Sequence, residues 1–464
     1  MAVFNAYSHE EMIATLKQAA PHADIYTDAD TLAQHKNDPN GIGDADGDLL
    51  AYIEVSDVDD IKGVLATARK YHLPVIPQTT ATSTVSGSDA ETNALMLSTV
   101  KMNRILDISR EDQVAVVQPG VINQTLNEAA NKIGMFYAPD PGSRPISGIG
   151  GNASTNAGGM STVKYGATRD AVLGLKVVLA DGRELKLGGR TFKQAFGYDL
   201  THLFVGSEGT LGIITEITVK LLPIPLGKAV MGLAFFDNMT ALSKAVTEVR
   251  ASGVYPAMLE ALDAKTVAAL DVYEGTHYAE NNGAMLILRL DVGGDEALAA
   301  TEKILDQYGA NHLHVTTDDT EMASIEKLRQ DMLPAVFAGN NHVMEDMAVP
   351  MSQLAPMMDY ITEVADQLHV NVFTAGHAGD GNVHPTLTWP KDQTAVPDNV
   401  IQALQLMFRK ALALGGTISG EHAVGMLKNQ WVNEELGDNV DYVQHQIKSL
   451  LDPMGILNPK RKIN

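Results

Sequence analysis

Residues 139–170 form the segment that most constrains how this chain can fold. The segment reads PDPGSRPISGIGGNASTNAGGMSTVKYGATRD, and Gly, Ser, Asn and Pro are too frequent in it for regular helix or strand. Short strand patterns precede it, and another follows it at residues 173–182. A loop of this length inside a compact domain is uncommon unless it is functional. We therefore expect an irregular, functional loop here.

The glycines of this segment are compatible with a phosphate-bearing cofactor. GIGGNA at 148–153 fits the dinucleotide fingerprint G-x-G-x-x-A, in which a tight turn opens a helix onto a pyrophosphate. The context argues against a Rossmann fold, because prolines precede the motif in place of a strand and polar residues follow it in place of a helix. Successive backbone N–H groups in a glycine-rich coil can still form an anion-binding concavity.

The chain divides into regions of different pattern. Residues 49–77 show a strand, a helix that begins near Ser56 or Asp57 and ends about Tyr71, and a second strand, which predicts a parallel pair with a right-handed crossover. Prolines near residue 225 indicate a domain boundary. Beyond it, longer helical patterns alternate with strands. We expect an α+β domain there, with helices on one face of an antiparallel sheet.

Length and composition exclude several classes of site. A chain of 464 residues predicts two or three domains. It has no cysteine, so any metal must be held by His, Asp, Glu or carbonyl oxygen. The net charge of −23 argues against nucleic acid as a partner and against a basic surface for anionic lipid.

The N-terminal pattern favours a helix over a signal peptide. Ser8 and Glu11 form a capping box, and acidic residues follow at once. No apolar run approaches the ~18 residues of a membrane-spanning helix. We expect a cytoplasmic protein without an integral membrane segment, and peripheral association with a membrane is compatible with this.

Two histidines lie on either side of an Asp-Gly pair in AGHAGDGNVHPTL, residues 375–387. Asp380 and Gly381 between two apolar runs predict a two-residue type I′ hairpin turn. His377 then lies directly opposite His384, with Cβ atoms about 4.5 to 5.5 Å apart. Such a pair can share one metal ion. It can also be a cross-strand pair without a ligand, and this stretch alone leaves both interpretations open.

Several long motifs carry a family resemblance. They are DPGS at 140–143, IGGNASTNAGG at 149–159, Tyr165-Gly166, VGSEGTLGIIT at 205–215, GHAGDGNVHP at 376–385, SGEHAVG at 419–425 and DPMGILNP at 452–459. In this order they resemble the motifs of the FAD-linked D-2-hydroxyacid dehydrogenases. That family includes D-lactate dehydrogenase and the glycolate oxidase catalytic subunit, within the vanillyl-alcohol oxidase and para-cresol methylhydroxylase (PCMH) superfamily.

The resemblance implies an α+β protein with three parts. Residues 1–225 would form a PCMH-type FAD-binding domain of two α/β subdomains. Residues 226–425 would form an α+β cap domain that carries the substrate and metal site. Residues 426–464 would return to the FAD domain.

The resemblance also implies a set of site residues. FAD would be bound non-covalently by Thr82, Gly87, Pro141, Gly142, Ser143, Ile149, Gly150, Gly151, Asn152, Asn156, Gly158, Gly159, Tyr165, Gly166, Glu208, Gly209, Gly212, Ile213, Ile214 and Asn458. One divalent metal ion, zinc or manganese, would be bound by His377, His384 and Glu421. His422 would be the catalytic base. Arg329 would hold the substrate carboxylate, and the alternative for Arg329 is a solvated residue on a charged helix.

These residues match the oxidation of a D-2-hydroxy acid, with D-lactate to pyruvate as the leading reaction. A metal lowers the pKa of the hydroxyl, a histidine takes its proton and flavin N5 accepts the hydride. The alternatives are a glycolate oxidase catalytic subunit, a redox-neutral flavin transferase, which the metal ligands oppose, and a non-catalytic flavin-binding subunit. The expected partners are a small 2-hydroxy acid and an electron acceptor, namely a quinone, an electron-transfer flavoprotein or a partner subunit. A homodimer is also compatible.

The sequence departs from the family pattern in two places. The first pyrophosphate loop, QTTATSTVSGS at 78–88, has Thr79 and Ala81 where the family usually has glycine, although Thr82 and Gly87 are kept. Backbone approach to phosphate is then harder, and we expect weaker FAD binding than in a glycine-loop relative. No histidine or cysteine in this loop offers a covalent link to FAD. Ala423 also stands where glycine is usual.

Overall fold

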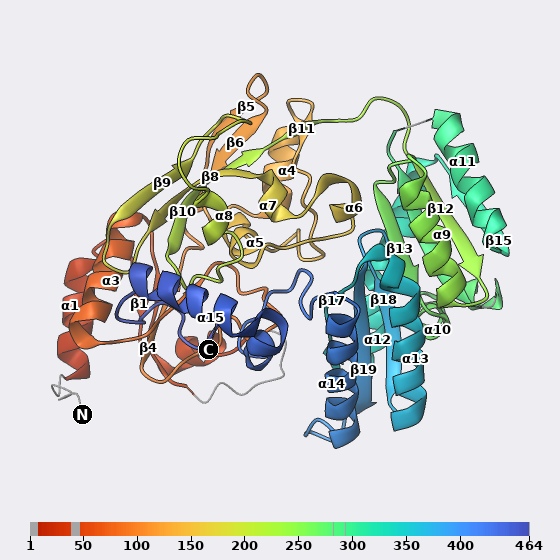
Figure 1. Ribbon diagram of the computed structural model, residues 1–464. Helices are drawn as coiled ribbons and strands as arrows, with labels where there is room; N and C mark the ends of the chain where they lie inside the picture. The colour runs from red at the N-terminus through yellow and green to blue at the C-terminus, as the bar shows by residue number, and fades with distance from the viewer. Residues whose placement is uncertain (1–7, 39–46, 282, 293, 464) are drawn as a thin grey trace. The chain divides into compact units, whose positions relative to one another are not determined.

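The computed structural model describes residues 8–38, 47–281, 283–292 and 294–463 (Figure 1). The chain forms two compact units. The first unit contains residues 1–157, 167–224 and 421–464, and the second contains residues 158–166 and 225–420.

A small sheet in the first unit contains β1 (Asp24–Tyr26), β2 (Leu49–Glu54), β4 (Ala94–Ser98) and β3 (Val75–Gln78), in that order. Helices α1 (His9–Ala19), α2 (Ala29–Gln34) and α3 (Val58–Tyr71) accompany it. β2 and β3 are parallel as predicted, but each pairs with β4, which lies between them. The predicted ends of α3 are confirmed, because Asp57 caps it and Tyr71 is its last residue. Ser8 caps α1, as the capping-box pattern predicts.

A second sheet of the first unit is antiparallel. Its order is β5 (Ile105–Ser109), β6 (Val114–Val117), β10 (Ile213–Lys220), β8 (Val172–Val178) and β9 (Glu184–Gly188). The short strands β7 (Met135–Phe136) and β11 (Leu222–Pro223) pair with each other. Around the sheet lie α4 (Asn123–Asn131), α8 (Thr201–Phe204) and α15 (Val432–Leu451).

The segment 139–170 is less irregular than its composition predicts. It forms three short helices, α5 (Ile149–Thr155), α6 (Thr162–Tyr165) and α7 (Thr168–Ala171). Ile149 and Ala153 of α5 are fully buried in the core of the first unit. Tertiary packing therefore offsets the cost of two helical glycines. The expectation that no helix follows GIGGNA is wrong, although no strand leads into the motif within the described residues 139–148.

The second unit contains a sheet with the order β15 (His312–Thr316), β12 (Val230–Phe236), β14 (Ala284–Leu290), β13 (Met258–Leu262), β18 (Asn371–Gly376), β19 (Asn382–Pro390) and β16 (Asn340–Met344). β17 (Met347–Ala348) also pairs with β19. All these pairings are antiparallel, as predicted.

Helices cover both faces of this sheet, so the prediction of helices on one face is wrong. α10 (Ala264–Glu274) and α12 (Asp319–Phe337) share a core cluster with Phe235. Phe236, which points to the opposite face, is also fully buried. α9 (Met239–Ala251), α11 (Gly294–Gln307), α13 (Leu354–Leu368) and α14 (Asp398–Ala413) complete the unit. The burial pattern of β13 and β14 agrees with helices on both faces of the sheet. These strands are buried at nearly every successive position, as strands covered on both faces are.

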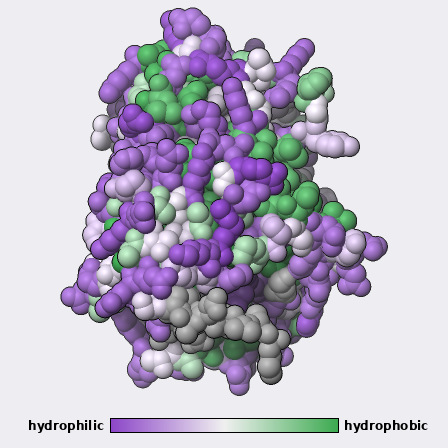
Figure 2. Space-filling view, turned by 90° about the vertical axis from the view of Figure 1, so that its left-hand side faces the viewer, coloured by the Kyte–Doolittle hydropathy of each residue, from purple (hydrophilic) through white to green (hydrophobic). Residues whose placement is uncertain are grey.

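The face seen in Figure 2 carries hydrophilic side chains over much of its area. Within the described part of the chain, no helix is long and apolar enough to cross a membrane.

Candidate active site

The hairpin that carries the two histidines has a different register from the predicted one. Ala375, and not His377, pairs with His384. The strands end at Gly376 and begin again at Asn382, so a five-residue connection replaces the predicted two-residue turn. Gly381 has a φ of 85°, whereas Asp380 does not reach positive φ, so the connection is not a type I′ turn.

Close backbone approach explains why the prediction failed. A Cβ on Gly376 would lie 2.3 Å from the Asn382 carbonyl oxygen, and one on Gly381 would lie 2.2 Å from the Val349 carbonyl oxygen. These glycines therefore serve packing within the second unit, which the hairpin sequence alone does not reveal.

His377 lies one residue beyond the end of β18, and its ring still lies beside that of His384. His377 and His384 are diagonal neighbours, with ring centroids 5.2 Å apart and ring planes at 87°. Both side chains are buried.

Each histidine has a hydrogen-bond acceptor beside its Nδ1 atom. His377 Nδ1 lies 2.7 and 2.9 Å from the two carboxylate oxygens of Glu260. His384 Nδ1 lies 3.1 Å from the backbone carbonyl oxygen of Glu345. These oxygens accept, so we assign a proton to Nδ1 in both rings. Metal-binding histidines commonly donate their second N–H to a carboxylate or carbonyl in this way. The donor set therefore fits a divalent metal ion.

Arg329, on α12, shares Glu260 with His377. Its Nε donates to Glu260 Oε2 at 2.6 Å, and 11% of the Arg329 side chain and none of the Glu260 side chain is exposed. The alternative of a solvated arginine does not describe this residue. Its guanidinium instead balances a buried carboxylate.

Glu421 and His422 follow the last residue of the second unit. Gly420 donates its N–H to the Asp346 carbonyl oxygen at 3.1 Å. Glu421, joined to it by one peptide bond, opens the last stretch of the first unit. Glu421 Oε1 lies 3.7 Å from His422 Nε2, and the side chains are 13% and 20% exposed.

Four segments that contain expected cofactor residues converge in the first unit. Thr80 Oγ accepts from Gly148 N at 3.1 Å. The Glu208 N–H donates to the Ser154 carbonyl at 2.8 Å. Asn458 Nδ2 donates to the carbonyl oxygens of Gly87 and Glu208. The pyrophosphate loop, the start of α5, the turn before β10 and the C-terminal segment are thereby joined. They carry Thr82, Gly87, Ile149, Gly150, Gly151, Asn152, Asn156, Glu208, Gly209, Gly212 and Asn458, with Ile213 and Ile214 at the start of β10.

The remaining expected cofactor residues are placed differently. Pro141, Gly142 and Ser143 lie in the turn that leads toward α5. Gly158, Gly159, Tyr165 and Gly166 belong to the second unit, where the Tyr165 hydroxyl and the Lys164 ammonium contact the Asp291 carboxylate.

Buried polar atoms in the first unit fit a large polar cofactor. Among the described residues, Ser86 Oγ, Asn123 Oδ1 and Asn458 Oδ1 are buried and have no hydrogen-bond partner. Ser86 and Asn458 lie in the converging segments, and Asn123 bonds to Asn152 of α5. A Cβ on Gly151 would meet open space. Buried polar groups are normally satisfied, so these atoms and the open space beside Gly151 are compatible with a polar ligand such as FAD.

Sequence reasoning missed Glu260 and the Glu345 carbonyl. Glu260 lies in the strand MLEAL, and a charged residue inside a wholly buried strand was the signal that could have identified it.

Comparison with known proteins identifies two domains. Residues 49–188 match a FAD binding domain, and residues 227–461 match the C-terminal domain of FAD linked oxidases.

Individual relatives cover most of the chain. Glycolate oxidase subunit GlcD of Bacillus subtilis (strain 168) is 37% identical over 88% of each chain. D-lactate dehydrogenase of Anaerostipes hadrus is 32% identical over 97% of this chain and 96% of its own. The crystal structure of p-cresol methylhydroxylase with substrate bound superimposes with a TM-score of 0.81 at 17% identity, over 98% of this chain and 97% of that one, and so supports the fold alone. The chain therefore belongs to the FAD-linked oxidoreductase family that contains the D-lactate dehydrogenases and glycolate oxidase subunits, and it has their PCMH-type α+β fold.

Proposed function

We propose that this protein oxidises D-2-hydroxy acids, and D-lactate to pyruvate in particular, with FAD and one divalent metal ion, Zn²⁺ or Mn²⁺. The observation that carries the proposal is the pair His377 and His384, whose Nδ1 atoms are occupied by Glu260 and the Glu345 carbonyl. Histidines that bind a metal through Nε2 commonly make such a hydrogen bond through Nδ1, so the pair supports a metal site. Glu421 would be the third ligand.

The reaction removes a proton and a hydride from the substrate. FAD, when bound, supplies the hydride acceptor, and the metal ion, when bound, lowers the pKa of the substrate hydroxyl. His422 takes the hydroxyl proton as general base. Arg329 pairs its terminal guanidinium nitrogens with the substrate carboxylate while its Nε stays with Glu260. The electrons then leave to a quinone, an electron-transfer flavoprotein or a partner subunit.

Glycolate is the second candidate substrate, because the glycolate oxidase subunit of Bacillus subtilis is 37% identical to this chain. Glycolate carries the same hydroxyl and carboxylate as D-lactate and lacks only the methyl group. The same residues would therefore act on either compound.

Anaerobic bleaching of the flavin tests the proposal. Purified holoprotein is mixed with D-lactate, L-lactate or glycolate, and the flavin absorbance is followed. We expect D-lactate to reduce the flavin fastest. Faster reduction by glycolate would reassign the substrate, and no reduction by any 2-hydroxy acid would favour a non-catalytic flavin-binding subunit. His422→Ala should reduce the flavin at least ~10²-fold more slowly while it still binds FAD.

A further inference from the structure

We infer that Glu208 is a positioning residue that holds the backbone next to His422. The inference rests on the proposed role of His422 as the catalytic base. The resemblance implies that Glu208 lines the cofactor, and the structure shows in addition that its carboxylate contacts the 421–425 segment.

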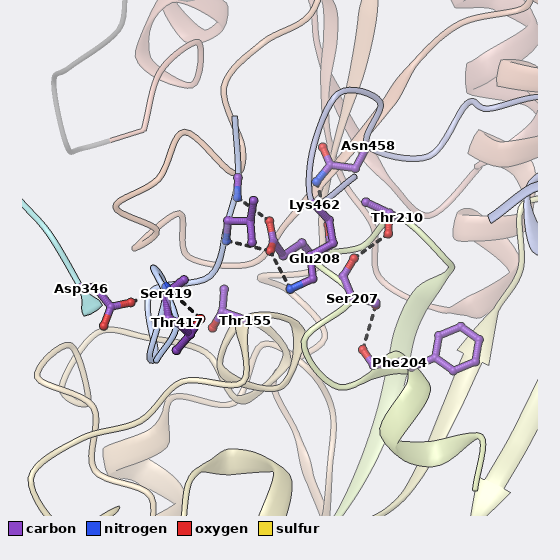
Figure 3. Close-up of polar contacts among 12 residues, drawn as sticks. Thr155, Phe204, Ser207, Glu208, Thr210, Asp346, Thr417, Ser419, Asn458 and Lys462 are labelled. Atoms are coloured by element: carbon purple, nitrogen blue, oxygen red, sulfur yellow. Dashed lines mark hydrogen bonds and ion pairs between the residues drawn. The ribbon is translucent and has the colours of Figure 1, made fainter. Parts of the chain in front are cut away.

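The two carboxylate oxygens of Glu208 accept hydrogen bonds from consecutive backbone N–H groups. Val424 N donates to Oε1 at 2.9 Å, and Gly425 N donates to Oε2 at 2.7 Å (Figure 3). Lys462 Nζ lies 3.4 Å from Oε1, and 4% of the Glu208 side chain is exposed. Charged acceptors form stronger hydrogen bonds than neutral ones. The carboxylate therefore holds the backbone, through two hydrogen bonds, at the second and third residues after His422.

The backbone just before these two hydrogen bonds has an unfavourable conformation. Ala423, between His422 and Val424, has a φ of 75°, in the left-handed region that disfavours residues with a Cβ. Such a conformation persists only where surrounding contacts determine it. The Glu208 contacts begin at the next residue, so they are placed to hold Ala423 in this conformation.

Glu208 is itself anchored on both sides. Its N–H donates to the Ser154 carbonyl at 2.8 Å, and its carbonyl accepts from Asn458 Nδ2 at 2.7 Å. Gly425 is confined from another direction, because a Cβ there would lie 1.9 Å from the Val85 carbonyl oxygen. The same oxygen accepts from Met426 N at 3.0 Å. His422 therefore precedes a backbone segment that is held by two separate parts of the first unit.

A test begins with Glu208→Gln, which keeps the size of the side chain but places an NH₂ group against one backbone N–H. We expect flavin reduction by D-lactate to slow by up to about 10²-fold, the scale for a small misplacement of a catalytic group. The FAD content and the Kd for substrate should change far less. Glu208→Asp, which keeps the charge but is shorter, should show a smaller loss and covers the case in which the amide variant does not fold.

Ala423→Gly supplies a rescue that separates positioning from general stability. Glycine adopts positive φ without support from the Glu208 hydrogen bonds. Ala423→Gly combined with Glu208→Gln should therefore recover much of the lost rate of flavin reduction. Lys101→Met is the control, because Lys101 Nζ pairs with Asp24 at 2.7 Å in the first unit and contacts neither Glu208 nor the 421–425 segment in any described hydrogen bond. It should leave the flavin reduction rate unchanged.

Hydrogen exchange of the peptide that contains Val424 and Gly425 tests their hydrogen bonds to Glu208 independently of turnover. Faster exchange in Glu208→Gln, together with the slow rate and the rescue, supports the inference. Hydrogen exchange at the wild-type rate in Glu208→Gln would overturn the positioning role of Glu208. Flavin reduction at the wild-type rate in Glu208→Gln, while His422→Ala is slow, would overturn it as well. Either outcome leaves the proposed function intact. A wild-type rate in His422→Ala instead removes the base assignment of the proposed function.

Discussion

Glu260 is a charged residue in a strand that is otherwise apolar, and none of its side chain is exposed. A buried carboxylate without partners is unfavourable, but this one is bound by Arg329 on one side and His377 on the other. The motif around the histidines could be found in the sequence because its residues are close in the chain. Glu260 lies 117 residues from His377, and no local spacing links the two.

Loss of the Glu260 charge should weaken the proposed metal site. Glu260→Gln keeps an acceptor for His377 but removes the charge that raises the basicity of its ring. We expect the affinity for metal to fall about 10- to 100-fold, as it does when other hydrogen-bond partners of metal-binding histidines are changed. The measurement is metal content after dialysis against buffered chelator. Glu326→Gln, at a partly exposed 4.0 Å ion pair with Arg289, is the control that should retain metal normally. Equal retention by both variants would argue against the role of Glu260.

Thr79 and Ala81, the two residues of the pyrophosphate loop that depart from the family pattern, differ in backbone conformation. Ala81 has a φ of 50°, so it does adopt the conformation for which glycine is suited. Thr79 does not reach positive φ, and its hydroxyl lies 3.0 Å from that of Thr99. Its methyl group fills the space beside Gly148, where a Cβ would lie 2.4 Å from it. Only Ala81 is therefore a strained substitution.

Ala81→Gly should relieve that strain. We expect the free energy of unfolding to rise by about 1 kcal/mol and FAD to bind at least as tightly as to wild type. Thr79→Gly should lower both stability and FAD affinity, because it removes a packed methyl group and a hydrogen bond. Thermal unfolding and titration of FAD into stripped protein measure both effects. Weaker FAD binding by Ala81→Gly would mean that the alanine loop already suits the cofactor.

At the scale of elements, local signals predicted helices better than strand pairing. The N-cap of α3 at Asp57 and its end at Tyr71 follow from capping and periodicity in a single stretch of chain. The position of β4 between β2 and β3, and the register of the β18–β19 hairpin, depend on residues far away in the sequence. Gly381 shows the difference, because its contact with the Val349 carbonyl oxygen sets the course of the connection.

Gly381→Ala should destabilise the second unit beyond the cost of positive φ alone. Gly309 has nearly the same φ, 86° against 85°, but a Cβ there would meet nothing within 4 Å. Gly309→Ala should therefore cost only about 1–2 kcal/mol. Gly381→Ala should cost clearly more, since its Cβ would also lie 2.2 Å from the Val349 carbonyl oxygen. Denaturant unfolding compares the two variants, and equal losses would show that the hairpin relaxes around the added methyl group.

At the scale of the whole molecule, the expected FAD and metal residues fall largely in different units. The pyrophosphate loop, α5 and the turn before β10 belong to the first unit, while His377 and His384 belong to the second. Each unit has its own hydrophobic core. Each motif is local, so the motifs allow a FAD part and a metal part to be expected, and the assignment of the motifs to those sites stays a prediction. They did not predict that residues 158–166 belong to the second unit, since that placement depends on the contacts with Asp291.

This division leads to a prediction about metal removal. If His377 and His384 bind a metal ion as proposed, a chelator would withdraw it and leave the hydrogen bonds among the expected FAD loops, such as Gly148 N to Thr80 Oγ, untouched. Chelated protein should therefore keep its FAD and lose flavin reduction by D-lactate. Added Zn²⁺ or Mn²⁺ should restore the reaction in wild type and not in His384→Ala, because only wild type retains both imidazole ligands. Flavin absorbance, elemental analysis and the reduction rate are measured on the same samples. Full activity in protein shown to be metal-free would remove the metal from the mechanism, and release of FAD on chelation would show that the two sites depend on each other.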